Sequence, residues 1–85
     1  MTSPRVVLYT AVYCRWCWRA RALLDDAGIA YRVHDVTVDL AERRRLGRET
    51  GRRTVPFVFI DGASIGGHDE LVALARSGEL ARRLG

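Results

Sequence analysis

The chain has 85 residues, of which 48% are hydrophobic and 28% are charged, and its formal net charge at pH 7 is +4. This length allows one folded domain, spanning residues 1–85, and the composition excludes an intrinsically disordered chain. All 14 basic residues are arginine, and a net positive charge favours small anionic ligands or acidic partners without by itself indicating nucleic acid.

The hydropathy pattern indicates the cellular compartment in which we expect the protein. No apolar run is long enough to span a bilayer, and no signal-peptide pattern precedes the apolar run at residues 6–9. We therefore expect a cytoplasmic protein that contacts no membrane. Structural disulfides rarely persist in the cytoplasm, so this expectation counts against a structural disulfide between the two cysteines.

The first half of the chain alternates strand-like and helix-like segments. In chain order the pattern predicts strands at residues 5–10 and 31–36 and helices at residues 15–27 and 39–50. Gly28 stands where a left-handed stop of the first helix is expected. Asp39 with Glu42 three residues later is typical of a capped helix start, and Gly51 supplies the stop of that second helix.

The second half predicts a hairpin followed by two helices. The expected segments are strands at 57–60 and 63–65, a helix at 68–76 and a short helix at 79–84. Asp61-Gly62 between two apolar runs is a strong hairpin signal. The order β-α-β-α-β-β-α-α favours a right-handed parallel crossover, with the hairpin extending the same sheet antiparallel. We therefore expect an α/β fold with a four-stranded mixed sheet flanked by helices.

Cys14 and Cys17 lie three positions apart where the first predicted helix begins. A zinc site needs four ligands, and only His34 and His68 could join the two cysteines, at a spacing that matches no zinc finger. We therefore expect no metal. A Cys-x-x-Cys pair beside a β-α-β pattern is instead typical of a redox pair.

The predicted position of Cys14 suits a nucleophile. At the N-terminus of a helix its sulfur can accept backbone N–H groups, and the helix dipole stabilises a thiolate there. Cys17 lies one turn inside the helix and should be less exposed, which suits it to resolving a mixed disulfide.

Thr54-Val55-Pro56 precedes the third predicted strand. A proline cannot sit in the middle of a sheet ladder, so this one is expected at the strand entrance. The Val55-Pro56 bond is a candidate for the cis form, and a plain trans proline that opens a strand is the alternative.

Gly66-Gly67-His68-Asp69 stands at the start of the third predicted helix. Free N–H groups at such a start can bind an anion, and glycines allow a carboxylate to approach closely. The alternative is a glycine-rich turn in which Asp69 only caps the helix.

With these features in this order, the sequence resembles the glutaredoxins, specifically the small bacterial dithiol type. The segments that carry the resemblance are VVLYT, CRWC, GRRTVPFVFIDG and IGGHDEL. The resemblance implies a thioredoxin-like fold with glutathione bound beside Cys14, its cysteine backbone pairing with Val55 as an added strand. It also implies that the γ-glutamyl carboxylate of glutathione lies at His68 and Asp69. Its glycine carboxylate would meet basic groups, which we assign to Arg43 and Arg53.

The chain departs from the family pattern at the active-site motif. Arg15 and Trp16 stand between the cysteines, where the family usually has proline and tyrosine, and Ala11 replaces a usual lysine that contacts glutathione. A positive charge on Arg15 would stabilise the Cys14 thiolate if its side chain turns that way, and a solvated arginine at a helix start is the alternative. Ala11 is expected to leave a gap beside the thiolate.

We therefore expect a monomeric glutathione-dependent thiol–disulfide oxidoreductase, with glutathione as co-substrate and disulfide-containing or glutathionylated proteins as partners. The expected catalytic residues are Cys14 and Cys17. The expected glutathione-binding residues are Arg15, Trp16, Arg43, Arg53, Thr54, Val55, Pro56, Gly67, His68 and Asp69. One alternative is a redoxin-type electron donor recharged by thioredoxin reductase. Another is a carrier of an iron–sulfur cluster ligated by Cys14 and glutathione in a dimer.

The arginines on the second predicted helix have two interpretations. Arg43, Arg44, Arg45 and Arg48 crowd that segment, and a solvated helical face explains most of them. A dedicated anion-binding patch is the alternative. No pattern typical of a nucleic-acid-binding module accompanies them, so no nucleic-acid partner is expected.

Overall fold

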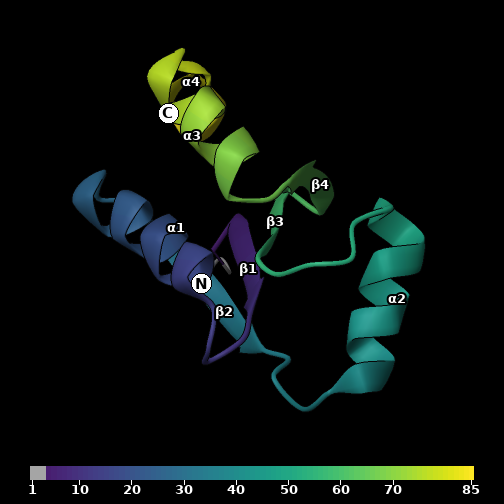
Figure 1. Ribbon diagram of the computed structural model, residues 1–85. Coiled ribbons are helices and arrows are strands. Elements are labelled where there is room, and N and C mark those ends of the chain that lie inside the picture. Colours follow the sequence, from purple (N-terminus) through teal and green to yellow (C-terminus); the bar gives the residue numbers. More distant parts are fainter. Residues whose placement is uncertain (1–3) are drawn as a thin grey trace.

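A computed structural model describes residues 4–85 and has the predicted order of elements. They are β1 (Val6–Thr10), α1 (Arg15–Asp26), β2 (Tyr31–Asp35), α2 (Leu40–Thr50), β3 (Phe57–Ile60), β4 (Ala63–Gly66), α3 (His68–Arg76) and α4 (Glu79–Leu84) (Figure 1). The predicted boundaries agree with these to within one residue, because local capping residues set most of the ends.

The four strands form one mixed sheet in the order β2-β1-β3-β4. β1 pairs with β2 in parallel, whereas β1 with β3 and β3 with β4 are antiparallel. Asp61 and Gly62 join β3 to β4 with φ angles of 52° and 82°, as a two-residue hairpin turn requires. The predicted sheet, including the parallel crossover and the hairpin, is confirmed.

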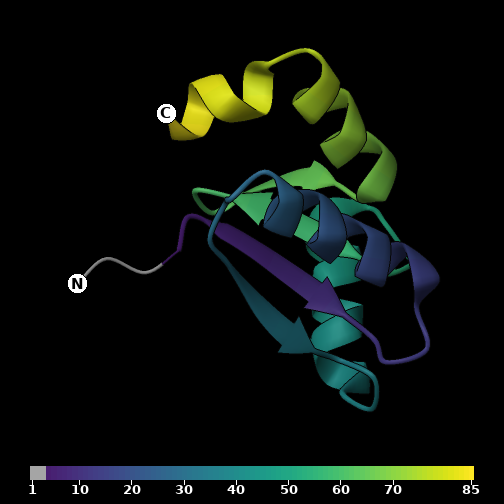
Figure 2. The same cartoon turned by 90° about the vertical axis from the view of Figure 1, so that its left-hand side faces the viewer.

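Helices cover both faces of this sheet. Figure 2 shows α1 in front of the strands and α2 behind them, while α3 and α4 lie on the same side as α1. The main core lies between the sheet and this α1–α3 layer and consists of Val6, Leu8, Ala20, Leu24, Val58, Ile60, Leu71 and Leu80. This arrangement is the predicted thioredoxin-like α/β fold.

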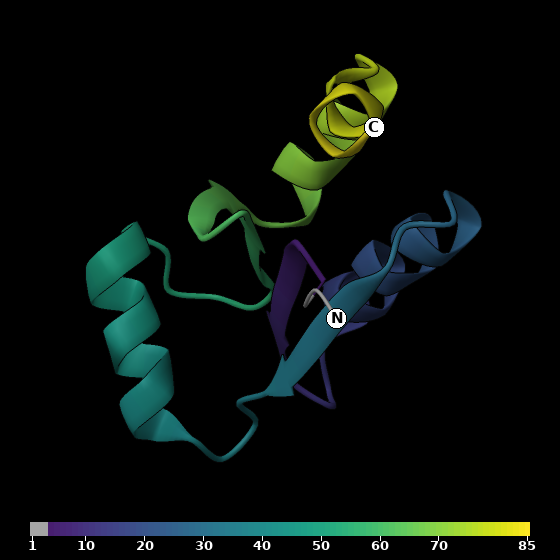
Figure 3. The ribbon, with the colours of Figure 1, turned by 180° about the vertical axis from the view of Figure 1, so that it is seen from behind.

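A second buried cluster lies toward the carboxyl end of β1 and includes both cysteines. Its members are Ala11, Cys14, Cys17, Val36, Leu46, Val55 and Phe57. Leu46 is the buried residue of α2 and connects that helix to this cluster. Figure 3 shows α2 and α1 on opposite sides of the strands. This cluster fixes the start of α1 against the segment that precedes β3.

The predicted caps of α2 are present, with one difference. The Asp39 carboxylate accepts the backbone N–H of Glu42 at 3.1 Å, and Gly51 ends the helix with φ 78°. The Glu42 side chain does not reach back to close a capping box. It pairs with Arg45 instead, because the arginine lies one turn further along the same helix face.

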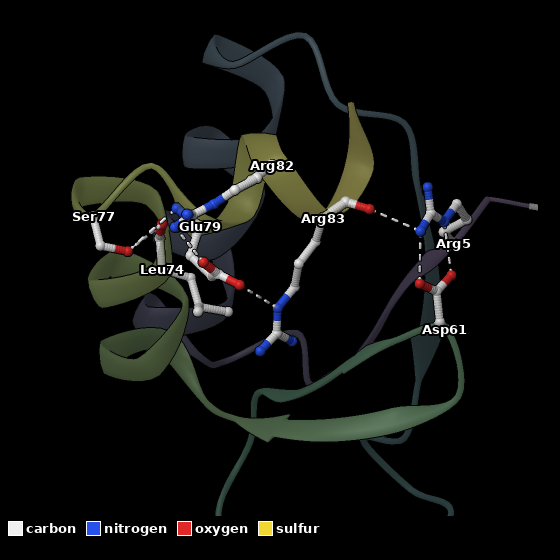
Figure 4. A network of polar contacts seen from close by, with 7 residues as sticks. All are labelled: Arg5, Asp61, Leu74, Ser77, Glu79, Arg82 and Arg83. Carbon is white, nitrogen blue, oxygen red and sulfur yellow. Dashed lines mark hydrogen bonds and ion pairs between the residues drawn. The ribbon is translucent and has the colours of Figure 1, made fainter.

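One polar network joins the N-terminal end of β1, the hairpin turn and α4. The Arg5 guanidinium donates to both carboxylate oxygens of Asp61, at 2.7 and 2.8 Å, and to the backbone carbonyl of Arg83 at 2.8 Å (Figure 4). The hydrogen bonds from Arg5 hold the pKa of the Asp61 carboxyl below its ordinary value. Both side chains are about half exposed, so water screens the pair.

This network predicts a small pH-dependent contribution to stability. A carboxyl with a lowered pKa in the folded state stabilises the fold above its unfolded pKa of about 3.9, and this contribution is lost as the pH falls below that value. We expect Asp61→Asn to be slightly less stable than the parent at pH 7, and the difference to shrink toward zero below about pH 3. Urea unfolding at both pH values measures it, and a difference that grows on acidification would contradict the assignment.

Among residues 4–85, the structure contains no helix with the length and apolar composition needed to cross a bilayer.

Candidate functional site

Cys14 is the N-cap residue of α1, as predicted. Its backbone is extended, with φ −92° and ψ 108°, and its N–H donates to the Ala11 carbonyl at 3.1 Å. The Cys14 Sγ accepts the backbone N–H of Cys17 at 3.1 Å. A sulfur in this position receives a hydrogen bond and lies at the positive end of the helix dipole, and both favour a negative charge on it.

The segment before β3 faces Cys14. The Cys14 thiol lies 3.7 Å from the Val55 carbonyl, to which it donates. The Val55-Pro56 peptide bond is cis, the candidate form indicated by the sequence. Cys14 therefore lies between the first turn of α1 and the Thr54-Val55-Pro56 segment.

Cys17 is positioned as a protected second thiol. It is 2% exposed, compared with 7% for Cys14, and both are free cysteines. Burial, and after it the hydrogen bond to Cys14, raise the pKa of the Cys17 thiol to about 12. Cys17 is therefore a neutral thiol at physiological pH while Cys14 is free.

An open groove of about 280 Å³ lies beside the cis-proline segment. Six of its lining residues were predicted from the sequence, namely Trp16, Thr54, Val55, Pro56, His68 and Asp69, and two were not, namely Arg52 and Glu70. The groove thus brings together three segments that are far apart in the chain: the start of α1, the entrance to β3 and the start of α3.

Trp16 and His68 form a tilted aromatic pair along the groove. Their ring centroids lie 5.1 Å apart at an interplanar angle of 46°. The guanidinium carbon of Arg19 lies 4.7 Å from the centroid of the Trp16 ring, a cation–π distance. The ring nitrogen Nδ1 of His68 lies 3.2 Å from an Asp69 carboxylate oxygen. Because Trp16 is 48% exposed, the pair presents an aromatic surface to a ligand in the groove.

Glu70, rather than Asp69, caps the N-terminus of α3. Its carboxylate accepts the Gly67 N–H at 2.7 Å and also the Arg52 guanidinium at 3.2 Å. The Asp69 side chain is 90% exposed, so the alternative in which Asp69 caps the helix is wrong. A Glu at the third helical position is a recognised capping signal, and it could have identified Glu70 from the sequence.

Arg52 is the arginine that lines the groove, and its guanidinium pairs with the Glu70 carboxylate. Its guanidinium lies so close over Gly67 that a Cβ atom at Gly67 would come within 2.2 Å of Nη2. The structure does not bring Arg43 and Arg53 to this groove. Arg43 donates to the Tyr13 hydroxyl at 2.8 Å, and Arg53 lines a neighbouring hollow. Their assignment to the glycine carboxylate of glutathione stays a prediction.

Two of the departures from the family pattern, Arg15 and Ala11, have different surroundings. Arg15 is exposed at the first position of α1 and takes part in none of the ion pairs among residues 4–85. Ala11 is 3% exposed and belongs to the buried cluster around the cysteines. Ala11 also lines a small hollow of about 160 Å³ with Cys17 and Trp18, and the expectation of a gap beside the Cys14 thiolate stays a prediction.

The capping contact gives a stability prediction. Glu70→Ala removes the acceptor of the Gly67 N–H and should lower the free energy of unfolding by about 1 kcal/mol. Asp69→Ala is the matched control, since it removes a carboxylate from the same helix turn without touching the cap, and its effect should be a few tenths of a kcal/mol. Urea unfolding of the three proteins measures both. Equal losses would show that the capping contact is not what Glu70 contributes.

Among residues 4–85, no group of three or more His, Cys, Asp or Glu side chains is arranged to hold a metal ion.

Comparison with known proteins gives one consistent result. The glutaredoxin family model matches residues 6–65. Glutaredoxin 3 of Escherichia coli K12 is 40% identical over 75 residues, which cover 88% of this chain and 90% of that protein. The glutaredoxin of Pseudomonas aeruginosa is 38% identical over 77 residues, covering 91% and 92%.

Solved structures agree with the sequence matches. The crystal structure of a buckwheat glutaredoxin–glutathione complex superimposes with a TM-score of 0.91 at 34% identity, covering 95% of this chain and 76% of that one. The solution structure of a glutaredoxin from Brucella melitensis gives a TM-score of 0.82 at 33% identity, with coverages of 96% and 89%.

Proposed function

Because the chain belongs to the glutaredoxin family of thiol–disulfide oxidoreductases, we propose that it uses glutathione to reduce protein–glutathione mixed disulfides and protein disulfides. The observation that carries this proposal is the position of Cys14. Its sulfur caps α1 and faces the cis-proline segment beside the groove. This position combines a stabilised sulfur with room for a bound thiol.

In the first half of the reaction, the Cys14 thiolate attacks the glutathione sulfur of a mixed disulfide. A bond forms between Cys14 and glutathione, the protein–glutathione bond breaks, and the protein thiolate leaves and takes a proton from water. A glutathione thiolate then attacks the glutathione sulfur held on Cys14, which frees the Cys14 thiolate and releases glutathione disulfide. Each transfer needs three sulfurs nearly in line, so orientation of the incoming thiol in the groove lowers the barrier.

A protein disulfide follows a second route through Cys17. Cys14 attacks one sulfur and forms a mixed disulfide with the substrate protein, and Cys17 then attacks Cys14 to release the reduced substrate. The interaction with Cys14 is one of the causes of the raised Cys17 pKa. Once Cys14 is bound in a disulfide, that cause is removed, so Cys17 loses its proton more readily at the step that requires it.

Glutathione binding draws on three features of the groove. The start of α3 at His68 and Asp69 offers backbone donors to the γ-glutamyl carboxylate, while Val55 offers its main chain to the cysteine of glutathione. Arg52 adds a positive charge beside this helix start. The similarity to the buckwheat glutaredoxin–glutathione complex supports this arrangement.

A coupled assay tests the choice of electron donor. The protein is given a mixed disulfide of glutathione and a small thiol, once with glutathione, its reductase and NADPH, and once with thioredoxin reductase and NADPH. We expect NADPH oxidation in the first mixture and little in the second. The reverse result would favour the redoxin-type electron donor and would contradict glutathione dependence.

A further inference from the structure

A second hollow with a strongly positive lining lies at the C-terminal end of α2. It has a volume of about 470 Å³ and is lined by Arg44, Gly47, Arg48, Gly51, Arg52 and Arg53. Four of the six lining residues are arginines and none is acidic. We call this site the arginine hollow.

The charges on α2 are separated into two stripes. Arg45 pairs with both glutamates of the helix, Glu42 and Glu49, and neutralises them along one stripe. The other stripe carries Arg44 and Arg48, which lie four residues apart and therefore on one side of the helix. Within the part of the chain from residue 4 onward, none of the ion pairs involves Arg44, Arg48 or Arg53.

The helix dipole explains only part of this arrangement. A cation in the last turn of a helix is favourable, and Arg48 occupies such a position. Arg53 lies beyond the helix, and Arg44 lies more than a turn before its end, so the dipole accounts for neither. Arg52 pairs with Glu70, but the other three arginines have no carboxylate partner among the described residues, and such a cluster of like charges attracts an anionic ligand.

The hollow is held in shape by close backbone packing. The Arg52 carbonyl lies so near α2 that a Cβ atom on Gly47 would be 3.2 Å from it. Gly51, with φ 78°, reverses the chain between the helix and Arg52. The segment that carries Arg52 and Arg53 is therefore packed against the helix that carries Arg44 and Arg48.

Arg52 connects the arginine hollow to the groove beside Cys14. It lines both sites, and its Nε is buried with no hydrogen-bond partner among the described residues. Because Arg52 lines both sites, a protein joined by a disulfide to glutathione in the groove would lie next to the hollow.

We propose that the arginine hollow docks an acidic segment of the substrate protein, on one side of the substrate cysteine whose disulfide bond is broken. The proposal rests on the function proposed above and adds a preference among its protein substrates. Aspartate and glutamate side chains match the site because an arginine guanidinium can bind a carboxylate through two parallel hydrogen bonds. Arginines placed on two sides of a hollow can engage two successive acidic residues.

Three glutathionylated peptides of equal length test the preference. In the first set they differ only in the two residues that precede the cysteine, which are Glu-Glu, Gln-Gln or Lys-Lys. In a second set the same pairs follow the cysteine. The measurement is kcat/KM for deglutathionylation, expressed as the ratio of the Glu-Glu to the Gln-Gln peptide. A ratio cancels any general loss of activity in a variant.

The variant that tests the hollow is R44E/R48E, and R32E/R76E is its matched control. Both lower the net charge by the same amount, and Arg32 and Arg76 are exposed residues on β2 and α3 that line neither site. We expect R44E/R48E to lower the ratio by roughly tenfold at low salt, and the control to leave it nearly unchanged. The milder R44Q/R48Q variant should give an intermediate value, and 0.5 M salt should remove most of the difference.

The outcomes separate the two proposals. Equal ratios in the two double charge-reversal variants would mean that only net charge matters and would overturn the arginine hollow alone. The same conclusion would follow if the parent protein did not distinguish the Glu-Glu from the Lys-Lys peptide in either placement. Inactivity of the parent on all of the peptides would overturn the proposed function, and the docking proposal with it.

Discussion

Replacing Cys14 with serine is expected to abolish every thiol-transfer activity of this protein. A serine hydroxyl at physiological pH is a far weaker nucleophile than a thiolate and cannot form a disulfide. We therefore expect kcat/KM to fall by on the order of 10³-fold or more with both small mixed disulfides and protein disulfides. The glutathione-coupled assay measures the first activity, and loss of a protein disulfide followed by mass spectrometry measures the second.

The Cys14→Ser variant should still fold, which makes its inactivity interpretable. A serine oxygen can accept the Cys17 N–H that Cys14 Sγ accepts now, and serine is a favoured N-cap residue. Its urea unfolding curve should match that of the parent to within about 1 kcal/mol. Residual activity above one per cent of the parent's, roughly, would show that another group attacks the disulfide and that Cys14 is not the nucleophile.

Replacing Cys17 with serine is expected to separate the two activities. Deglutathionylation needs only Cys14 and a second glutathione, so it should stay within a few-fold of the parent. Reduction of a protein disulfide needs Cys17 to release the substrate from Cys14, and it should fall by on the order of 10²-fold or more. A mixed disulfide between Cys14 and the substrate should accumulate and be visible by mass spectrometry without reductant.

Because Cys17 is buried, the comparison of activities needs a control for the stability of the Cys17→Ser variant. Its side chain is 2% exposed, so serine places a hydroxyl in a buried cluster and costs some stability. Activities are therefore compared at a temperature where circular dichroism shows both proteins folded. If Cys17→Ser and Cys14→Ser lose deglutathionylation to the same extent, the proposed division of roles between the two cysteines is wrong.

Local chemistry made much of this fold readable from the sequence. Asp39 and Gly51 cap the two ends of α2 in the structure, as the sequence predicts. Such caps can be predicted because they depend only on residues within one turn. The Asp61-Gly62 hairpin follows from the two positive φ angles that such a turn requires. The N-cap position of Cys14 is local in the same sense, since it depends on where a strand ends and a helix begins.

Only some of the residues that line the groove could be predicted from the sequence. The sequence indicated the Thr54-Val55-Pro56 segment and the helix start at His68, because each has a recognisable composition. It did not indicate Arg52. Arg52 and Arg53 are adjacent in an irregular segment, where no helical or strand period determines which side chain points to which side.

The sequence by itself determined which elements form, in what order, and that two cysteines stand at a helix start. Only the tertiary structure decided which charged side chains line the groove beside the cysteines. The order β2-β1-β3-β4 places the entrance to β3 beside the end of β1. The antiparallel pairing of β3 with β4 sets Val58 opposite Gly66, which brings Arg52 over Gly67 and next to Glu70. These contacts join residues up to 18 positions apart, and their formation depends on how the sheet and helices pack rather than on any local pattern.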